Sequence, residues 1–159
     1  MNITILCVGQ VKEKFYRDAI AEYSKRLSRY GRLHIIEVAD EKTKENASSA
    51  EIEAVLRKEG ERIIKHIREN DYCITLEIEG KTLDSVALSN HLQHLGVMGQ
   101  SNIVFVIGGS LGLDESIKKR SDLALSFSAM TFPHQLMRVI LLEQIYRSFR
   151  IMNNEPYHK

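Results

Sequence analysis

The sequence has few cysteines, no long apolar run and no large excess of either charge. Its 2 cysteines, Cys7 and Cys73, lie in apolar, strand-like stretches without the spacing of a zinc site, so we expect buried free thiols, a reducing compartment and no bound metal. No stretch approaches the ~20 apolar residues of a membrane span, and the chain starts with a strand-like run instead of a charged leader. We therefore expect a cytoplasmic protein that makes no contact with membranes.

The near balance of charge excludes a surface that is basic all over. The chain has 22 lysines and arginines against 21 aspartates and glutamates, for a formal net charge of +1. Any surface that binds nucleic acid must therefore be local. Basic residues gather around the expected first helix and on the last one: Lys12, Lys14, Arg17, Lys25, Arg26, Arg29 and Arg32, and Arg138, Arg147 and Arg150. An ordinary solvated helix surface explains both groups at least as well.

Short apolar runs alternate with amphipathic stretches along the whole chain. Strands are expected at residues 2–9, 33–38, 72–78, 103–107 and 123–128, and helices at residues 16–30, 51–67, 83–95, 114–120 and 133–153. The capping-box pair Ser48 and Glu51 predicts the start of the second helix, and the polar run before it, residues 39–49, predicts a mobile loop. Gly80 predicts a turn after the third strand.

The alternation of strands with helices, without a hairpin signal, predicts an α/β fold with a mostly parallel sheet flanked by helices. The chain has 159 residues, is 43% hydrophobic and shows no repeat or linker, so we expect a single domain over residues 1–159. His91 and His94 fall at the end of the third helix. Because no third ligand stands at a useful spacing, we expect exposed helix-end side chains rather than metal ligands.

The last helix is apolar over far more than the ~100° stripe of a one-sided surface helix. Its apolar residues are Leu136, Met137, Val139, Ile140, Leu141, Leu142, Ile145, Tyr146, Phe149, Ile151 and Met152. Something besides its own sheet must cover this surface, and a second copy of the chain in a two-fold interface is the economical explanation. The alternative is a helix buried at the centre of a monomer.

Three segments are candidates for a functional site. Residues 108–112 (GGSLG) follow a buried strand and let a ligand approach the backbone, although the spacing matches neither the dinucleotide motif nor the phosphate-loop motif. Residues 125–134 pass through small and polar side chains into a helix that begins near Pro133. Residues 153–159 form an extended tail. From the residues alone, a tight turn, a plain connection and a disordered tail stay open as alternatives.

No Ser/His/Asp, Cys/His or metal-ligand constellation stands out in the sequence, which argues against most hydrolases. A cofactor that carries its own reactivity suits such a site.

Three stretches together resemble one family: VIGGSLGL at residues 106–113, TLEIEGK at residues 75–81, and the run from Leu125 to Lys159. They are similar to the small pseudouridine N3-methyltransferases of 23S rRNA in the SPOUT superfamily, and the resemblance covers essentially the whole chain. It implies a SPOUT α/β knot whose C-terminal segment threads a trefoil knot, a topology that general rules disfavour. It also implies a homodimer whose cofactor pockets lie beside the interface.

The resemblance further implies S-adenosyl-L-methionine as methyl donor, and 23S rRNA within the assembled ribosome as substrate. Carried over residue by residue, the cofactor site comprises Leu76, Gly108, Phe127, Ser128, Ala129, Met130, Thr131 and Phe132. His158 is a candidate to accept the N3 proton, and Tyr157 to stack on or hydrogen-bond the target base. Arg138 and His134 are candidates to hold a phosphate or a carbonyl oxygen.

Alternatives stay open beside this interpretation. The chain is also compatible with a SPOUT methyltransferase that acts on another RNA, such as a tRNA ribose, or with a non-catalytic dimer that binds an adenosine-type ligand. For Arg138, Glu143 and Arg147, an ion-paired interface is a simpler explanation than a role in catalysis.

Overall fold

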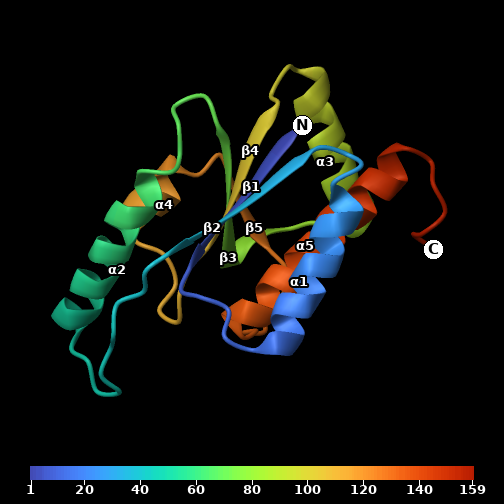
Figure 1. The fold of residues 1–159 in the computed structure, drawn as a ribbon. Helices are drawn as coiled ribbons and strands as arrows, with labels where there is room; N and C mark the ends of the chain where they lie inside the picture. The colour runs from blue at the N-terminus through green and yellow to red at the C-terminus, as the bar shows by residue number, and fades with distance from the viewer.

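The computed structural model describes residues 1–159, in which five strands and five helices alternate strictly (Figure 1). The elements are β1 Asn2–Val8, α1 Lys14–Leu27, β2 Arg32–Val38, α2 Ser49–Ile64, β3 Tyr72–Thr82, α3 Ser85–Val97, β4 Asn102–Ile107, α4 Glu115–Arg120, β5 Leu123–Ser126 and α5 His134–Met152. No helix combines the length and the apolar character needed to span a membrane.

The five strands form one sheet in the order β2-β1-β4-β3-β5, and every neighbouring pair is parallel. The predicted α/β fold with a mostly parallel sheet is confirmed. Because all strands run in the same direction, their carboxyl ends meet at one edge, and the connections that leave this edge lie side by side. In open parallel sheets this edge is where ligands bind.

Helices cover both faces of the sheet, three on one side and two on the other (Figure 1). The core on the side of α1, α3 and α5 contains 16 buried residues, and the core on the side of α2 and α4 contains 9. Strand β4 supplies Ile103 and Phe105 to the first core and Val104 and Val106 to the second. Burial on both faces explains why this strand is an unbroken apolar run in the sequence.

Side-chain caps set two helix starts where the sequence predicts them. The Ser48 hydroxyl accepts a hydrogen bond from the Glu51 backbone N–H at 3.2 Å, which confirms the capping box of α2. The Asp114 carboxylate accepts from the Ser116 backbone N–H at 3.2 Å and caps α4. Helix α5 begins directly after Pro133, as expected. Helix α2 ends at Ile64, three residues before the predicted end.

The turn predicted at Gly80 is wrong, because this glycine lies inside β3. The register against β5 shifts between Leu76 and Lys81, so residues 77–80 bulge away from the ladder. A β-carbon at Gly80 would come within 2.7 Å of the Ala124 backbone. The sequence therefore uses glycine here for close approach of two strands rather than for a turn.

The expectation for the two histidines of α3 is half right. His94 is exposed, but His91 is partly buried, with its ring centroid 5.6 Å from that of Tyr72. Burial of this imidazole, followed by the nearby His94 and Lys81, lowers the pKa of His91.

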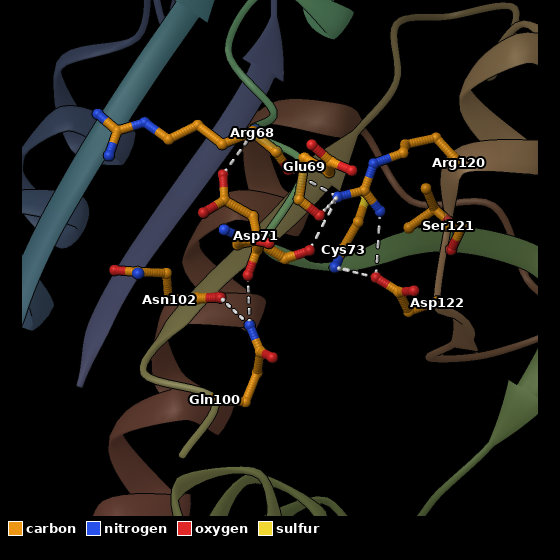
Figure 2. A network of polar contacts seen from close by, with 11 residues as sticks. Arg68, Glu69, Asp71, Cys73, Gln100, Asn102, Arg120, Ser121 and Asp122 are labelled. Atoms are coloured by element: carbon orange, nitrogen blue, oxygen red, sulfur yellow. Dashed lines mark hydrogen bonds and ion pairs between the residues drawn. The ribbon is translucent and has the colours of Figure 1, made fainter. Parts of the chain in front are cut away.

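A polar network fixes the amino-terminal edge of the sheet, opposite the ligand edge (Figure 2). The Arg120 guanidinium donates to the backbone carbonyls of Arg68 and Asp71, both at 2.8 Å. The Asp122 carboxylate accepts from the Cys73 backbone N–H at 2.8 Å and pairs with Arg120 at 3.2 Å. These contacts tie the end of α4 to the start of β3 and stabilise the fold at this edge.

Candidate active site at the carboxyl edge of the sheet

A cavity of about 470 Å³ lies where β3, β4 and β5 end. Its wall is formed by residues 76–79 of β3, residues 107–113 at and after the end of β4, residues 127–128 and 130–132 before α5, and single residues of three elements: Lys118, Leu125, His134 and Met137. Both this volume and the mixture of apolar and polar lining are typical of small-molecule sites. The first two candidate segments from the sequence thus meet in one place.

The glycine-rich connection after β4 is folded too tightly to admit side chains. A β-carbon on Gly108 would lie 2.5 Å from the carbonyl oxygen of Gly112, whose own φ is +92°. A β-carbon on Gly109 would lie 3.2 Å from a methyl group of Val8. At Gly108, Gly109 and Gly112 no side chain separates the backbone from the cavity, which Ser110, Leu111 and Leu113 of the same connection also line.

Serine side chains hold the connection between β5 and α5 in shape. The Ser126 hydroxyl donates to the Ile78 carbonyl at 2.8 Å, and the Ser128 hydroxyl accepts from the Met130 N–H at 3.0 Å. The first bond joins the β5 connection to the β3 bulge, and the second lies within the connection. The small, polar composition of this segment is explained by hydrogen bonding to its own backbone.

Every residue predicted to bind the cofactor lines this cavity except Ala129. The lining residues among them are Leu76, Gly108, Phe127, Ser128, Met130, Thr131 and Phe132. They come from three connections that are far apart in the sequence. Their contact with a ligand stays a prediction.

Arg138 lies away from the cavity, inside the fold. Its side chain is 2% exposed, and it donates to the Glu37 carboxylate at 2.5 Å and to the carbonyls of Val8 and Gly9 at 3.0 and 2.7 Å. The guanidinium thus anchors α5 to the carboxyl ends of β1 and β2. Arg138 is ion-paired, but with Glu37 of its own chain; the ion-paired interface considered for it and a catalytic role both stay predictions.

The C-terminal tail, residues 153–159, is packed on the outer side of α5. The Tyr157 hydroxyl donates to the Glu143 carboxylate at 3.0 Å, and its ring packs edge-on against Tyr146 with centroids 5.0 Å apart. Burial, and then the bond to Glu143, raises the pKa of Tyr157 to about 12. A guanidinium nitrogen of Arg147 lies 3.3 Å from Nδ1 of His158. Neither tail side chain lines the cavity of its own chain.

Other titratable side chains do face the cavity. His134 lines it at the start of α5, and its pKa is lowered by burial and then by Arg138, against the opposite effect of Asp40. Glu77, Glu79 and Lys118 also line the cavity, although no pattern in the sequence singled them out. The one available signal for the two glutamates was their presence in the TLEIEGK stretch, where alternation alone assigns them to exposed strand positions.

The arrangement is suited to binding rather than to nucleophilic attack by the protein. No Ser/His/Asp set points into the cavity, and no group of three or more His, Cys, Asp and Glu side chains is placed to hold a metal ion. Backbone groups, apolar side chains, one imidazole and carboxylates surround the space. The site therefore suits a ligand that brings its own reactive group.

A parallel α/β sheet with a glycine-lined cavity at its carboxyl edge defines the class of α/β enzymes that bind a nucleotide-like small molecule there. The model of a family described as "Predicted SPOUT methyltransferase" matches residues 1–158. The chain thus belongs to the SPOUT methyltransferase family, and it is an enzyme of the methyltransferase class.

Named relatives match the chain over its full length. It is 62% identical over 159 residues to the "Ribosomal RNA large subunit methyltransferase H" of Bifidobacterium adolescentis, and 58% identical over 159 residues to that of Clostridium kluyveri, with 100% of each chain covered. Among solved structures, the SpoU methyltransferase AviRb from Streptomyces viridochromogenes in complex with AdoMet is 12% identical with a TM-score of 0.46, covering 93% of this chain and 57% of that chain.

Proposed function

We propose that this protein transfers the methyl group of S-adenosylmethionine to N3 of a pseudouridine in 23S rRNA, within the assembled ribosome. The observation that carries the proposal is the match to ribosomal RNA large subunit methyltransferases H at 58–62% identity over 100% of both chains. The near-neutral net charge of +1 supports a substrate that is recognised by shape on a preassembled particle rather than as free RNA.

The cavity fits the methyl donor. It offers about 470 Å³, an apolar wall that includes Leu76, Phe127 and Phe132, and backbone groups of residues 107–113 for the polar atoms of an adenosine. When bound, the sulfonium supplies an electrophilic methyl carbon. The chain has to align the acceptor with this carbon, exclude water and let the N3 proton leave, and alignment alone contributes ~7 kcal/mol or more to such reactions.

The remaining requirement is a group that receives the N3 proton. Histidine is the side chain whose charge changes near neutral pH, which makes His158 the candidate base, and Tyr157 is the candidate to hold the target base. Both side chains belong to the tail on the outer side of α5. We therefore propose a homodimer in which the tail of one subunit completes the cavity of the other.

The surface of α5 supports this dimer. Several of its apolar side chains are only partly buried by the rest of the chain, namely Leu136, Val139, Ile140, Ile151 and Met152. A two-fold contact would cover them. The proposal also includes the trefoil knot, one functional domain over residues 1–159 and a cytoplasmic location.

The test combines binding with transfer. Calorimetry should detect binding of S-adenosylmethionine, and incubation with ribosomes that lack the modification should add one methyl group to 23S rRNA, measured by mass spectrometry of rRNA fragments. Fully modified ribosomes are the control and should accept nothing. Methylation of tRNA but not of ribosomes would favour the alternative substrate, and binding without transfer to either RNA would favour a non-catalytic dimer.

A further inference from the structure

Two carboxylates line the cavity at the β3 bulge, and neither has a role in the reaction derived above. Glu77 is partly buried and Glu79 is exposed. Both belong to residues 77–80, which the register shift pushes out of the ladder toward the cavity. Only Glu77 is held in place by a hydrogen bond within the chain; the exposed Glu79 carboxylate takes part in no side-chain hydrogen bond or ion pair and stays solvated.

Glu77 is held in place by a chain of hydroxyl groups. The Thr75 hydroxyl, which is 0% exposed, donates to the Glu77 carboxylate at 2.6 Å, and the Ser121 hydroxyl oxygen lies 2.7 Å from that of Thr75. A threonine hydroxyl has one hydrogen, so Ser121 must be the donor to Thr75. The two β3 residues are neighbours on one face of the strand. Hydrogen bonds thus run from Ser121 to Thr75 and from Thr75 to Glu77. They fix one carboxylate oxygen of Glu77 and leave the other free to bind a ligand.

No protein cation neutralises this carboxylate. Glu77 takes part in no ion pair in the structure. The ammonium nitrogen of Lys118, the lysine in the cavity wall, lies 3.7 Å from a carboxylate oxygen of Glu115 and forms no ion pair with Glu77. A partly buried carboxylate with a single hydrogen-bond donor is stabilised by an opposite charge nearby. The cavity is therefore prepared to receive a positive group.

We propose that Glu77 is the specificity-determining residue that recognises a cationic group of the methyl donor, and that Thr75 is its positioning residue. The inference rests on the proposed function, because S-adenosylmethionine carries two such groups, the sulfonium and the α-ammonium. Loss of one charge-assisted contact corresponds to about a 10-fold to 100-fold loss of affinity.

The experiment measures binding of three related ligands by calorimetry. S-adenosylmethionine has both cationic groups, S-adenosylhomocysteine has only the ammonium, and 5′-methylthioadenosine has neither. The proteins are the unmodified chain, Glu77→Gln and the matched control Glu79→Gln, which removes the same charge from the same wall. Thermal unfolding of each variant checks that it is folded.

Glu77→Gln should weaken binding of S-adenosylmethionine about 10-fold or more and leave 5′-methylthioadenosine within about 2-fold. The effect on S-adenosylhomocysteine identifies the group: unchanged binding assigns the sulfonium, and an equal loss assigns the ammonium. Glu79→Gln should leave all three affinities unchanged. Equal losses for all three ligands, no loss for any, or the same pattern in Glu79→Gln overturns the inference.

Variants at Thr75 keep the test decisive if Glu77→Gln does not fold. Thr75→Val should lower affinity for the cationic ligands selectively, because the carboxylate loses its donor, and Thr75→Ser should restore it. Failure of serine to rescue, or a loss that includes 5′-methylthioadenosine, contradicts the positioning role. If the unmodified chain binds none of the ligands, the proposed function fails with the inference; if it binds them without discrimination by Glu77, only the inference fails.

Discussion

Two positions, one in the cavity wall and one beside it, require glycine because of what lies opposite their α-carbons. Gly108 faces the carbonyl of Gly112, and Gly80 faces the backbone of Ala124, in both cases too closely for a β-carbon. In contrast, Gly96 lies in the last turn of α3, where a β-carbon would meet only the flexible end of Met1 at 3.3 Å. Replacing glycine by alanine should therefore destabilise the protein at Gly108 and Gly80 and stabilise it at Gly96.

Gly108→Ala should lower the free energy of unfolding by about 1–3 kcal/mol, because the β-carbon forces the backbone of Gly112 to move. It should also weaken binding of S-adenosylmethionine at least tenfold. Gly96→Ala is the control and should raise the free energy of unfolding by about 0.5–1 kcal/mol. Urea unfolding and calorimetry measure the two quantities, and an unchanged affinity in Gly108→Ala would argue against a ligand at this connection.

Sequence reasoning found some site residues and missed others for a physical reason. The glycine-rich segment with Gly108 and the small, polar segment with Ser128 were singled out from their composition, and the family resemblance supplied the individual cofactor residues, whose contact with a ligand stays a prediction. Glu77 was missed because its role depends on the bulge in β3, and the bulge depends on how β3 pairs with β5. Such pairing between distant segments leaves no periodic trace in the sequence.

The elements themselves follow the sequence closely, since hydrophobic periodicity and caps are local signals. The exceptions lie where contacts between distant elements, rather than local signals, determine the conformation of the chain. β3 continues to Thr82 beyond its apolar run, because it pairs with β5 on the far side of the bulge. The disordered tail left open as an alternative is not seen, since aromatic and charged groups of α5 and of the turn after α1 hold residues 153–159.

Glu155 is the central contact of the tail. Its carboxylate pairs with Arg150 and accepts from the Tyr30 hydroxyl at 2.9 Å, while its backbone N–H donates to the Arg150 carbonyl at 2.9 Å. Arg150 also donates to the Pro156 carbonyl at 2.8 Å. One side chain therefore joins the turn after α1, helix α5 and the tail.

Glu155→Gln should release the tail, because the amide cannot pair with Arg150, and stability should fall by about 1–2 kcal/mol. Amide hydrogen exchange should become faster in residues 153–159, and methyl transfer should decrease while binding of S-adenosylmethionine stays the same. Glu22→Gln is the matched control: it removes an exposed pair with Arg26 on α1 and should cost less than about 0.5 kcal/mol. Full methyl transfer with a mobile tail would remove the tail from the mechanism.

The molecule as a whole was the hardest level to predict. The layers and the parallel sheet follow from the alternation of elements, whereas the trefoil knot was suggested by resemblance alone, because rules of chain connection disfavour it. The dimer was expected from the apolar surface of α5 and from the family resemblance, and the absence of tail residues from the cavity of their own chain supports the proposal. The knot and the dimer both depend on contacts between segments that are far apart in the sequence or in different chains, and local sequence patterns do not encode such contacts.

A heterodimer tests whether two subunits share each site. Gly108→Ala impairs the cavity, and replacement of Tyr157 and His158 by alanine impairs the tail, so each homodimer should be inactive. A co-purified heterodimer should recover about half of the normal methyl transfer, because one of its two sites combines an intact cavity with an intact tail. No recovery would place the tail in the same subunit as its cavity, and failure to capture a heterodimer would contradict the dimer.

The two buried cysteines lie on opposite faces of the sheet, Cys7 in the larger core and Cys73 in the smaller one. Burial is the main cause that raises the pKa of Cys7 to about 12 and that of Cys73 to about 11, so neither forms the reactive thiolate while its layer is closed. Each sulfur becomes available to an alkylating reagent only when the helices above it separate from the strands. The chain thereby contains two native labels whose modification rates report separately on the opening of either side.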